Sequence, residues 1–324
     1  MQTVYLAVDV QGGDYGPRVI IDGILKAQKE SNTPLVVYLC GIKTDILSII
    51  DSNGCNDRLR NKELIIENCP QVIDIYEVPS RVWKNKKYSS LVRCISLQKE
   101  GIVHASLSAG DTRIIISAAI FLLGRVREVI RPALAAFLPT IISQPSLLLD
   151  VGANLNCRVE HLVTFGLMGY EYVKKYFLIK NPSVALLNVG EESSKGTKTI
   201  VEASIILSSK CKGYCGYIEG GRLLSGDANV IICDGFLGNV LLKTCESFHT
   251  LIESVLKGNQ KLIKLLIKNM TILNPENYGA VPLLGLKGVV LKAHGSSSSK
   301  AIAQAIFTAV RTIEKKVFIN NKVL

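Results

Sequence analysis

The sequence predicts an α/β protein with a mostly parallel sheet. Its first strand, Thr3 to Val10, is followed by a glycine-rich turn, a helical stretch from Val19 to Gln28 and a second strand, Leu35 to Cys40. The order strand, loop, helix, strand is typical of parallel strands joined by crossover helices. With 324 residues, of which 48% are hydrophobic and 20% charged, the chain can bury a large core as one α/β domain or as two smaller ones.

The composition narrows the class of protein and its partners. A formal net charge of +11 favours an acidic partner, which could be a nucleic acid, an anionic membrane surface or an acidic carrier protein. Nine cysteines are scattered without a Cys-x-x-Cys pair, which favours reduced thiols in a cytosolic protein. The N-terminus enters a strand pattern at once, and no apolar run of about 18 residues appears. We therefore expect a protein that is neither secreted nor membrane-spanning.

The first strand leads into a glycine-rich loop, Asp9 to Pro17. Because glycine has no Cβ atom, the backbone at Gly12 and Gly13 could approach a ligand closely. The dinucleotide fingerprint G-x-G-x-x-G is absent, and Asp9 and Asp14 flank the loop. This disfavours a nicotinamide-dependent dehydrogenase.

A lysine-rich stretch follows a predicted short strand, Leu64 to Glu67. Between Trp83 and Leu91 the polar side chains are Lys84, Lys86, Lys87, Ser89 and Ser90. Such a charged run is either a solvated face or an anion site.

The next strand, Ala105 to Ala109, leads through the turn Gly110 to Thr112 into an apolar helix, Ile114 to Leu123. Asp111 or Thr112 would cap this helix, because their side-chain oxygens can accept from its first backbone N–H groups. We therefore expect a strand, a turn and a capped helix in this part of the chain.

Two further apolar strands, Pro132 to Leu138 and Leu147 to Asp150, precede a helical stretch from Val159 to Phe177. The second of these strands ends in a turn that reaches Asn154. The pattern again indicates strands whose ends carry loops, as in a parallel sheet.

The strand Val184 to Val189 runs into the loop Gly190 to Gly196, which carries two carboxylates and Lys195. A lysine in such a loop could hold a phosphate or a developing oxyanion as a point charge. The alternative, which is the commoner one for a lysine in such a loop, is an ordinary exposed side chain.

The stretch around which the chain is organised begins with a buried strand, Val230 to Ile232. Asp234 and Gly235 end this strand, and the apolar positions after Asn239 recur at helical spacing. Ligands of open parallel sheets lie beyond the carboxyl ends of strands, where helix N-termini attract anions. This stretch is either such a phosphate or thioester site or an ordinary strand-to-helix connection.

The final strand, Gly288 to Lys292, ends at a glycine- and serine-rich turn that contains His294, and a helix from Lys300 to Lys316 follows. Of the four histidines, His294 is the one placed like a site residue, although a structural role competes with this interpretation.

A basic amphipathic segment precedes that strand. Lysines 257, 261, 264 and 268 fall on one side of a helix, and the apolar residues on the other side are Leu262, Ile263, Leu265, Leu266, Ile267 and Met270. Such a helix suits an anionic membrane surface, or its apolar face packs in a core or against a second subunit.

Taken together, these turns resemble the phosphate acyltransferase family (PlsX type), over residues 4 to 310. The matching stretches are Gly12-Gly13-Asp14 with Gly16-Pro17, Lys87 with Ser89-Ser90, Ser108-Ala109-Gly110, Arg131 to Leu134, Asp150 to Asn154, Asn188 to Glu192 with Lys195-Gly196, Cys233 to Asn239 with Lys243, Leu283 to Gly285, and His294-Gly295-Ser296. Each is weak alone, and their order and number make the combination specific.

The resemblance implies a single α/β acyltransferase domain over residues 1–324. It implies a three-layer α/β/α fold similar to phosphotransacetylases and isopropylmalate dehydrogenases. It also implies a homodimer and a helical hairpin at residues 247–275. This hairpin would associate with the membrane, with Lys261, Leu262, Leu265, Leu266 and Lys268 as the contact residues.

The implied reaction transfers a fatty acyl group from acyl-acyl-carrier-protein to inorganic phosphate, and the acyl phosphate serves phospholipid synthesis. The resemblance points to Lys195 and Asn239 as the groups that orient the acyl carbonyl and the phosphate. We add Asp234 as a supporting carboxylate and His294 as a proton acceptor or a support from outside the pocket. We expect the pocket itself to be lined by Gly12, Gly13, Asp14, Ser108, Gly110, Asn154 and Gly238.

No cofactor, metal or nucleic acid is expected. The expected partners are the acidic carrier protein, a second copy of the chain, a downstream glycerol-3-phosphate acyltransferase and the anionic inner face of the membrane. The expected location is therefore the cytoplasm, with peripheral attachment to that face.

The sequence departs from the family pattern in two loops. Asp111 replaces the usual Asn, Arg113 replaces the usual Gly, and Gln11 stands where Met is usual. Asp111 adds a negative charge near a presumed anion site, at a cost on the order of 1 kcal/mol unless a cation such as Arg113 neutralises it. Two alternatives follow: a weakened or non-catalytic membrane scaffold, and a phosphotransacetylase-like enzyme that uses acyl-coenzyme A.

Overall fold

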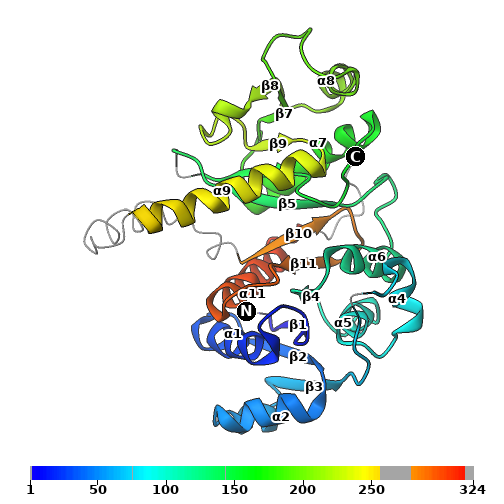
Figure 1. Cartoon of the computed structure of the whole chain (residues 1–324), viewed down its shortest axis with the longest axis vertical. Coiled ribbons are helices and arrows are strands. Elements are labelled where there is room, and N and C mark those ends of the chain that lie inside the picture. Colours follow the sequence, from blue (N-terminus) through cyan, green and yellow to red (C-terminus); the bar gives the residue numbers. More distant parts are fainter. Residues whose placement is uncertain (1, 75, 143, 256–278, 318–324) are drawn as a thin grey trace. The chain divides into compact units, whose positions relative to one another are not determined.

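The computed structural model describes residues 2–74, 76–142, 144–255 and 279–317, without the side chains of residues 249, 250, 252 and 253. The chain divides into two compact units (Figure 1). The first comprises Met1–Val126 and the described part of Tyr278–Asn321, and the second comprises the described part of Arg127–Asn277. The single domain expected over residues 1–324 stays a prediction.

The first unit contains a sheet with the strand order β3-β2-β1-β4-β11-β10. Its strands are β1 (Val4–Asp9), β2 (Leu35–Gly41), β3 (Leu64–Asn68), β4 (Ala105–Ser108), β10 (Ala280–Leu284) and β11 (Val289–Ala293). β10 runs antiparallel to β11, and the other pairings are parallel. The carboxyl ends of β1, β4 and β11 therefore meet at one edge of the sheet.

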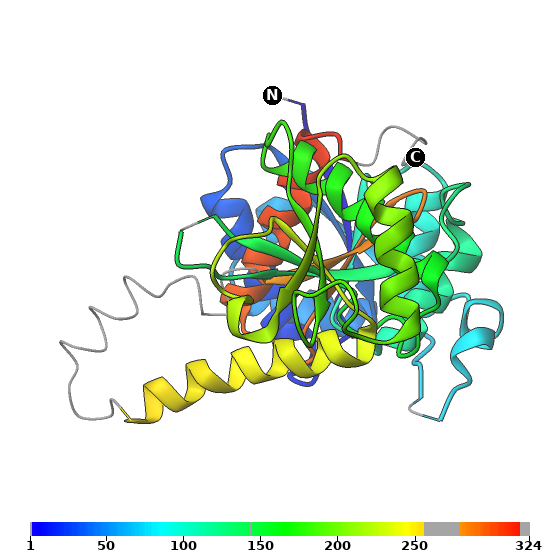
Figure 2. The same ribbon diagram turned by 90° about the horizontal axis from the view of Figure 1, so that it is seen from above.

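Helices cover both faces of this sheet. The helices of this unit are α1 (Gly16–Glu30), α2 (Lys43–Ser52), α3 (Asn56–Arg60), α4 (Pro79–Asn85), α5 (Ser90–Lys99), α6 (Thr112–Leu122) and α11 (Ser299–Glu314), of which α4 packs on α6. α1 and α11 pack side by side (Figures 1 and 2). Leu6 and Val8 of β1 belong to the core that α1 and α11 share, whereas Ala7 packs with Cys94 and Leu97 of α5. Alternate residues of a strand point to opposite faces, so the unit has α/β/α layers.

The second unit contains a sheet with the order β5-β6-β9-β7-β8. Its elements are β5 (Ala133–Leu138), β6 (Ser146–Leu149), α7 (Val159–Tyr176), β7 (Val184–Asn188), α8 (Lys198–Lys210), β8 (Tyr214–Glu219), the short 3-10 helix η1 (Gly220–Arg222), β9 (Val230–Ile232) and α9 (Gly235–Val255). β5 and β6 are antiparallel, and the other pairings are parallel. A Cβ atom at Gly169 would lie 2.5 Å from Val230, so the glycine lets α7 approach β9 closely.

The predicted fold class, α/β with a mostly parallel sheet, is confirmed by these pairings. The strand predicted at Val230–Ile232 is β9, with the same bounds. The elements that the sequence did not predict are α2, α3, α4, α5, α8, η1, β8 and β10.

The predicted membrane hairpin falls largely beyond the described residues. α9 covers its first part up to Val255, and Lys261, Leu262, Leu265, Leu266 and Lys268 lie outside the described residues. Among the helices that the structure describes, none combines the length and the apolar character needed to cross a bilayer.

Candidate functional site

A cavity of about 700 Å³ lies at the carboxyl ends of β1, β4 and β11 in the first unit. The residues that line it include Asp9, Gly12, Gly13, Asp14, Ser90, Gly110, Arg113, Lys292 and Gly295. Its volume is in the range of small-molecule sites, and its place at the strand ends is where open α/β sheets bind ligands.

Asp9 joins the loops that follow β1 and β4. Its side chain is buried, and it accepts hydrogen bonds from Gly12 N at 3.0 Å, Gln11 N at 3.2 Å and Ser108 Oγ at 2.7 Å. Burial raises the pKa of Asp9, and these donors, together with the Ser90 hydroxyl, oppose that rise. The carboxyl group therefore organises the glycine-rich loop through its backbone N–H groups.

The two loops touch so closely that only glycine fits between them. Ser108 Oγ accepts from Gly110 N at 3.0 Å. A Cβ atom at Gly12 would lie 2.7 Å from an Asp9 oxygen and 2.8 Å from Gly110 N. The predicted residues Gly12, Ser108 and Gly110 thus share one place in the structure.

The loop after β11 contributes the third side of this region. Asp14 N donates to Gly295 O at 2.8 Å, and Gly13 has a φ of +100°, which favours glycine. His294 is exposed, and its Nδ1 lies 2.8 Å from Ser296 Oγ. The ring therefore contacts its own loop, and Gly295 is the residue of this turn that lines the cavity.

Asp111 caps α6, which confirms the predicted cap. Its carboxylate accepts from Arg113 N at 2.8 Å and from Ile114 N at 3.3 Å. The Arg113 guanidinium donates to the same carboxylate, from Nη2 at 2.9 Å and from Nε at 3.3 Å. The contact with Arg113 lowers the pKa of Asp111. Two of the three departures from the family pattern, Asp111 and Arg113, therefore neutralise each other's charge.

A second cluster of loops surrounds Asp150 in the second unit. Asp150 is fully buried and accepts from Asn154 N at 2.6 Å, Leu134 N at 2.9 Å and Ala153 N at 3.2 Å. Asn154 Nδ2 donates to Asp150 at 3.0 Å and to Pro132 O at 2.8 Å. Burial raises the pKa of Asp150, and these donors oppose the rise. The carboxyl group therefore links the end of β6 to the start of β5.

The start of α9 packs on this cluster. Asp234 accepts from Leu237 N at 2.8 Å, and Gly235 N donates to Asn154 O at 2.8 Å. Asp234 is therefore positioned as the cap of α9, whose first turn presents backbone N–H groups.

Gly238 and Asn239 complete the contact between α9 and the loop after β6. A Cβ atom at Gly238 would overlap the Asp150 carbonyl oxygen, so only glycine fits there. Asn239 Nδ2 donates to Val151 O at 3.3 Å. The structure thus gathers four predicted residues, Asn154, Asp234, Gly238 and Asn239, around one loop.

Lys195 lies on the exposed loop after β7. Its Nζ is 2.7 Å from Glu192 Oε1, and this ion pair raises the pKa of Lys195, which keeps the ammonium charged. The buried Asn188 donates from Nδ2 to Gly190 O at 3.0 Å and to Lys195 O at 2.9 Å. Asn188 therefore closes the loop and fixes the backbone of the lysine.

Sequence reasoning missed several residues that build these clusters. It placed Asp9 beside the glycine-rich loop and Asp150 at a strand end that matches the family, but gave neither a role in the site. A carboxyl group directly before a glycine-containing loop is a usable signal for such a role. Lys292 lines the first cavity, although the sequence indicated it only as the end of a strand. Ser90 lines the cavity too, and it belongs to the lysine-rich stretch for which an anion site was one of two interpretations. Within the part of the chain that the structure describes, no group of three His, Cys, Asp or Glu side chains is arranged to hold a metal ion.

The chain is similar to known proteins in both its sequence and its fold. Residues 4–320 match the model of a family described as "Fatty acid synthesis protein". A phosphate acyltransferase from Dictyoglomus turgidum is 38% identical over 331 residues, which cover 98% of this chain and 96% of the relative. One from Campylobacter fetus is 37% identical over 325 residues, which cover 97% and 96%. A phosphotransacetylase structure from Streptococcus pyogenes aligns with a TM-score of 0.64 at 16% identity, covering 96% of this chain and 94% of that one.

Proposed function

The chain belongs to the phosphate acyltransferase family, and on this premise we propose that it forms acyl phosphate from an acyl-carrier-protein thioester and inorganic phosphate. One observation supports acyl transfer to phosphate: the chain matches phosphate acyltransferases over nearly its whole length. The carrier-bound donor and the use of the product in phospholipid synthesis are the finer parts of the proposal.

The proposed reaction needs positioning and electrostatic stabilisation. A phosphate oxygen attacks the thioester carbonyl carbon, a tetrahedral oxyanion forms, and the C–S bond breaks as the thiolate leaves. A free thiol has a pKa of about 8.5, so the thiolate can leave with little help from an acid. Fixed donors near the developing oxyanion then supply the largest part of the acceleration.

In the second unit we assign Lys195 and Asn239 as the groups that orient the acyl carbonyl and the phosphate. The Lys195 ammonium is charged and half-exposed, so an anionic substrate can replace Glu192 as its partner. The Asn239 amide lies at the start of α9, where helix N–H groups also favour an anion. Asp234 supports this turn as its cap.

In the first unit we assign the cavity beside Gly12, Gly13 and Gly110 to substrate binding. Asp9 holds these loops through buried hydrogen bonds, so their backbone is pre-organised. His294 supports the same region through the turn that it shares with Gly295. The contact of its ring with Ser296 favours this supporting role over that of a proton acceptor.

A basic segment whose neighbours in the sequence line that cavity supports the carrier protein as donor. We define the basic segment by three exposed cations, Arg81, Lys84 and Lys87, on and after α4. The cavity is lined by residues 72–74, which precede this segment in the sequence, and by residues 90–91, which follow it. An acidic carrier bound to the basic segment would therefore hold its thioester arm beside the cavity, and charge complementarity would speed the encounter.

Charge reversal of the basic segment, Arg81→Glu/Lys84→Glu/Lys87→Glu, is expected to raise the KM for palmitoyl-acyl-carrier-protein by about tenfold or more, with a steep salt dependence. The KM for phosphate and the turnover of palmitoyl-coenzyme A should not change, because neither needs the carrier surface. Steady-state acyl-phosphate formation with both donors measures this.

The matched control is Lys26→Glu/Lys29→Glu/Lys180→Glu, which changes the net charge equally at other exposed positions. An unchanged KM for the carrier in the basic-segment variant would remove this docking surface. Preference for short acyl-coenzyme A over the carrier would instead support the phosphotransacetylase-like alternative.

The non-catalytic scaffold is the second alternative, and it is motivated by the departures from the family pattern at Asp111 and Arg113. The contact between Arg113 and Asp111 weakens that motivation, because the carboxylate already has a cation as its partner. We further propose that the enzyme acts as a homodimer at the inner face of the membrane and passes its product to a glycerol-3-phosphate acyltransferase.

A further inference from the structure

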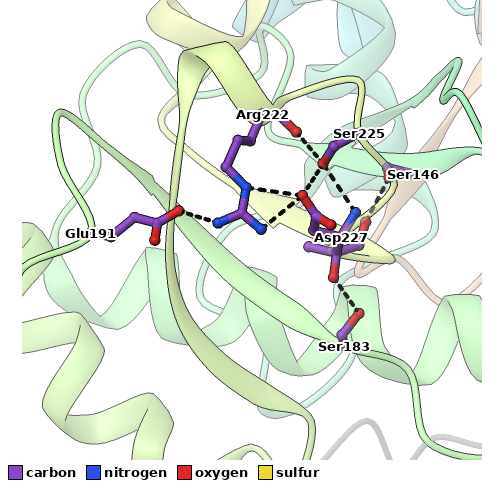
Figure 3. Close-up of polar contacts among 7 residues, drawn as sticks. Ser146, Ser183, Glu191, Arg222, Ser225 and Asp227 are labelled. Atoms are coloured by element: carbon purple, nitrogen blue, oxygen red, sulfur yellow. Dashed lines mark hydrogen bonds and ion pairs between the residues drawn. The ribbon is translucent and has the colours of Figure 1, made fainter.

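Arg222 links two carboxylates that come from separate segments of the second unit (Figure 3). It lies at the end of η1, and its Nη1 contacts Glu191 Oε1 in the loop after β7. Its Nε and Nη2 each lie 3.0 Å from Asp227 Oδ2, in the connection that leads to β9. The guanidinium therefore bridges the two segments.

The Asp227 side of this bridge is anchored to the sheet. Ser225 Oγ donates to Asp227 Oδ2, and Ser183 Oγ donates to the Asp227 carbonyl at 3.4 Å, next to the start of β7. Ser146 Oγ of β6 donates to Ala228 O at 2.6 Å. The contacts of Ser183 and Ser146 thus hold the connection against strands β7 and β6, and the Ser225 contact orients the Asp227 carboxylate within it (Figure 3).

The Glu191 side belongs to the loop that carries Lys195. Asn188 closes this loop through Gly190 O and Lys195 O, and Glu192 pairs with Lys195. Arg222 is therefore a side-chain link between this closed loop and the anchored connection before β9.

We propose that Arg222 is a positioning residue: through Glu191 it holds the loop on which Lys195 meets the substrate. This inference rests on the proposed function of Lys195. Three N–H groups of Arg222 point at carboxylates on opposite sides, which is the geometry of a clamp. All three side chains are about half-exposed, so the ion pairs contribute little to folding stability. Their effect lies in placement, because small displacements of a catalytic group lower turnover strongly.

Arg222→Gln is expected to lower kcat by about tenfold, without change in the KM for the acyl donor or in the unfolding midpoint. Arg222→Lys should lose nearly as much, because a single ammonium cannot reproduce a fork that reaches two carboxylates. The matched control is Arg60→Gln, which removes an exposed ion pair of 3.0 Å with Asp57 and should leave kcat unchanged. Full activity in Arg222→Gln would overturn the proposal.

A double-variant cycle tests the route of the effect. If Arg222 acts through Glu191, Glu191→Gln/Arg222→Gln should lose no more kcat than either single variant. In a Lys195→Ala background, Arg222→Gln should have no further effect on kcat. Losses that multiply in either cycle would mean that Arg222 acts by another route.

A measurement of the loop itself separates this inference from the proposed function. Hydrogen exchange of a peptide spanning residues 189–197 should be faster in Arg222→Gln and in Glu191→Gln. This expectation holds whether or not Lys195 takes part in catalysis. Unchanged exchange would refute the clamp. If exchange is faster but Lys195→Ala retains normal turnover, the clamp stands as a loop tether and the catalytic role of Lys195 fails.

Discussion

Lys195→Ala is expected to lower kcat for acyl-phosphate formation by about 10²- to 10³-fold, the loss seen when one donor to an oxyanion is removed. The side chain is half-exposed and pairs with Glu192, so its removal should leave the fold intact. Steady-state assays with saturating carrier and phosphate give kcat, and circular dichroism checks the fold.

The control for this variant is Lys198→Ala, three residues further along the chain. Lys198 is 90% exposed, and its Nζ lies 3.7 Å from Glu202 Oε1, so it offers the same chemistry without the loop position. It should retain full kcat. Normal turnover in Lys195→Ala would remove the central assignment of the mechanism.

Asp150→Ala is expected to destabilise the second unit by at least about 3 kcal/mol, because each buried donor left without an acceptor costs about 1–3 kcal/mol. Asp150 accepts hydrogen bonds from Leu134 N, Ala153 N and both nitrogen atoms of Asn154. Their loss should also loosen the start of α9. Hydrogen exchange of peptides covering residues 133–138 and 150–154 measures the local change, and urea unfolding measures the global one.

Asp57→Ala is the matched control for this prediction. The Asp57 side chain is 80% exposed, so its removal should change the unfolding free energy by no more than about 0.5 kcal/mol. Equal unfolding midpoints for the Asp150 and Asp57 variants would show that the buried carboxyl group does not organise these loops.

The sequence predicted most of the fully buried strands, although it missed β10, in which four of five residues are buried. Val230–Ile232 is such a strand, since an unbroken apolar run next to a turn has few other interpretations. It missed β8, an edge strand with Gly216 inside it and side chains that are mostly half-buried or exposed. It also missed α5, because Ser90 begins that helix directly after a lysine-rich stretch.

The lysine-rich stretch shows why a charge pattern alone does not place side chains. Lys87 is exposed, as a solvated face requires, and Lys86 pairs with Glu77 at 3.2 Å. Ser89 and Ser90, which follow at once, are buried, and the Ser90 hydroxyl contacts Asp9. The change from surface to cavity wall occurs within a few residues, and only tertiary packing decides where.

The candidate site was predictable to the extent that its contacts are local. Asp111 and Arg113 are two residues apart, so their mutual neutralisation could be proposed from the chain. Glu191 and Arg222 are 31 residues apart, and nothing in their spacing indicates that they meet. Their contact depends on the order of β7, β8 and β9 in the sheet.

The central claim is that this natural sequence transfers an acyl group to phosphate. The most direct test is acyl-phosphate formation from palmitoyl-acyl-carrier-protein and labelled inorganic phosphate, run beside the variant Asp111→Asn/Arg113→Gly. We predict turnover by the natural sequence at a rate comparable to that of the variant, because Arg113 already neutralises Asp111. Turnover by the variant alone would contradict this claim. It would mean that the natural sequence keeps the fold and the site but has lost the activity.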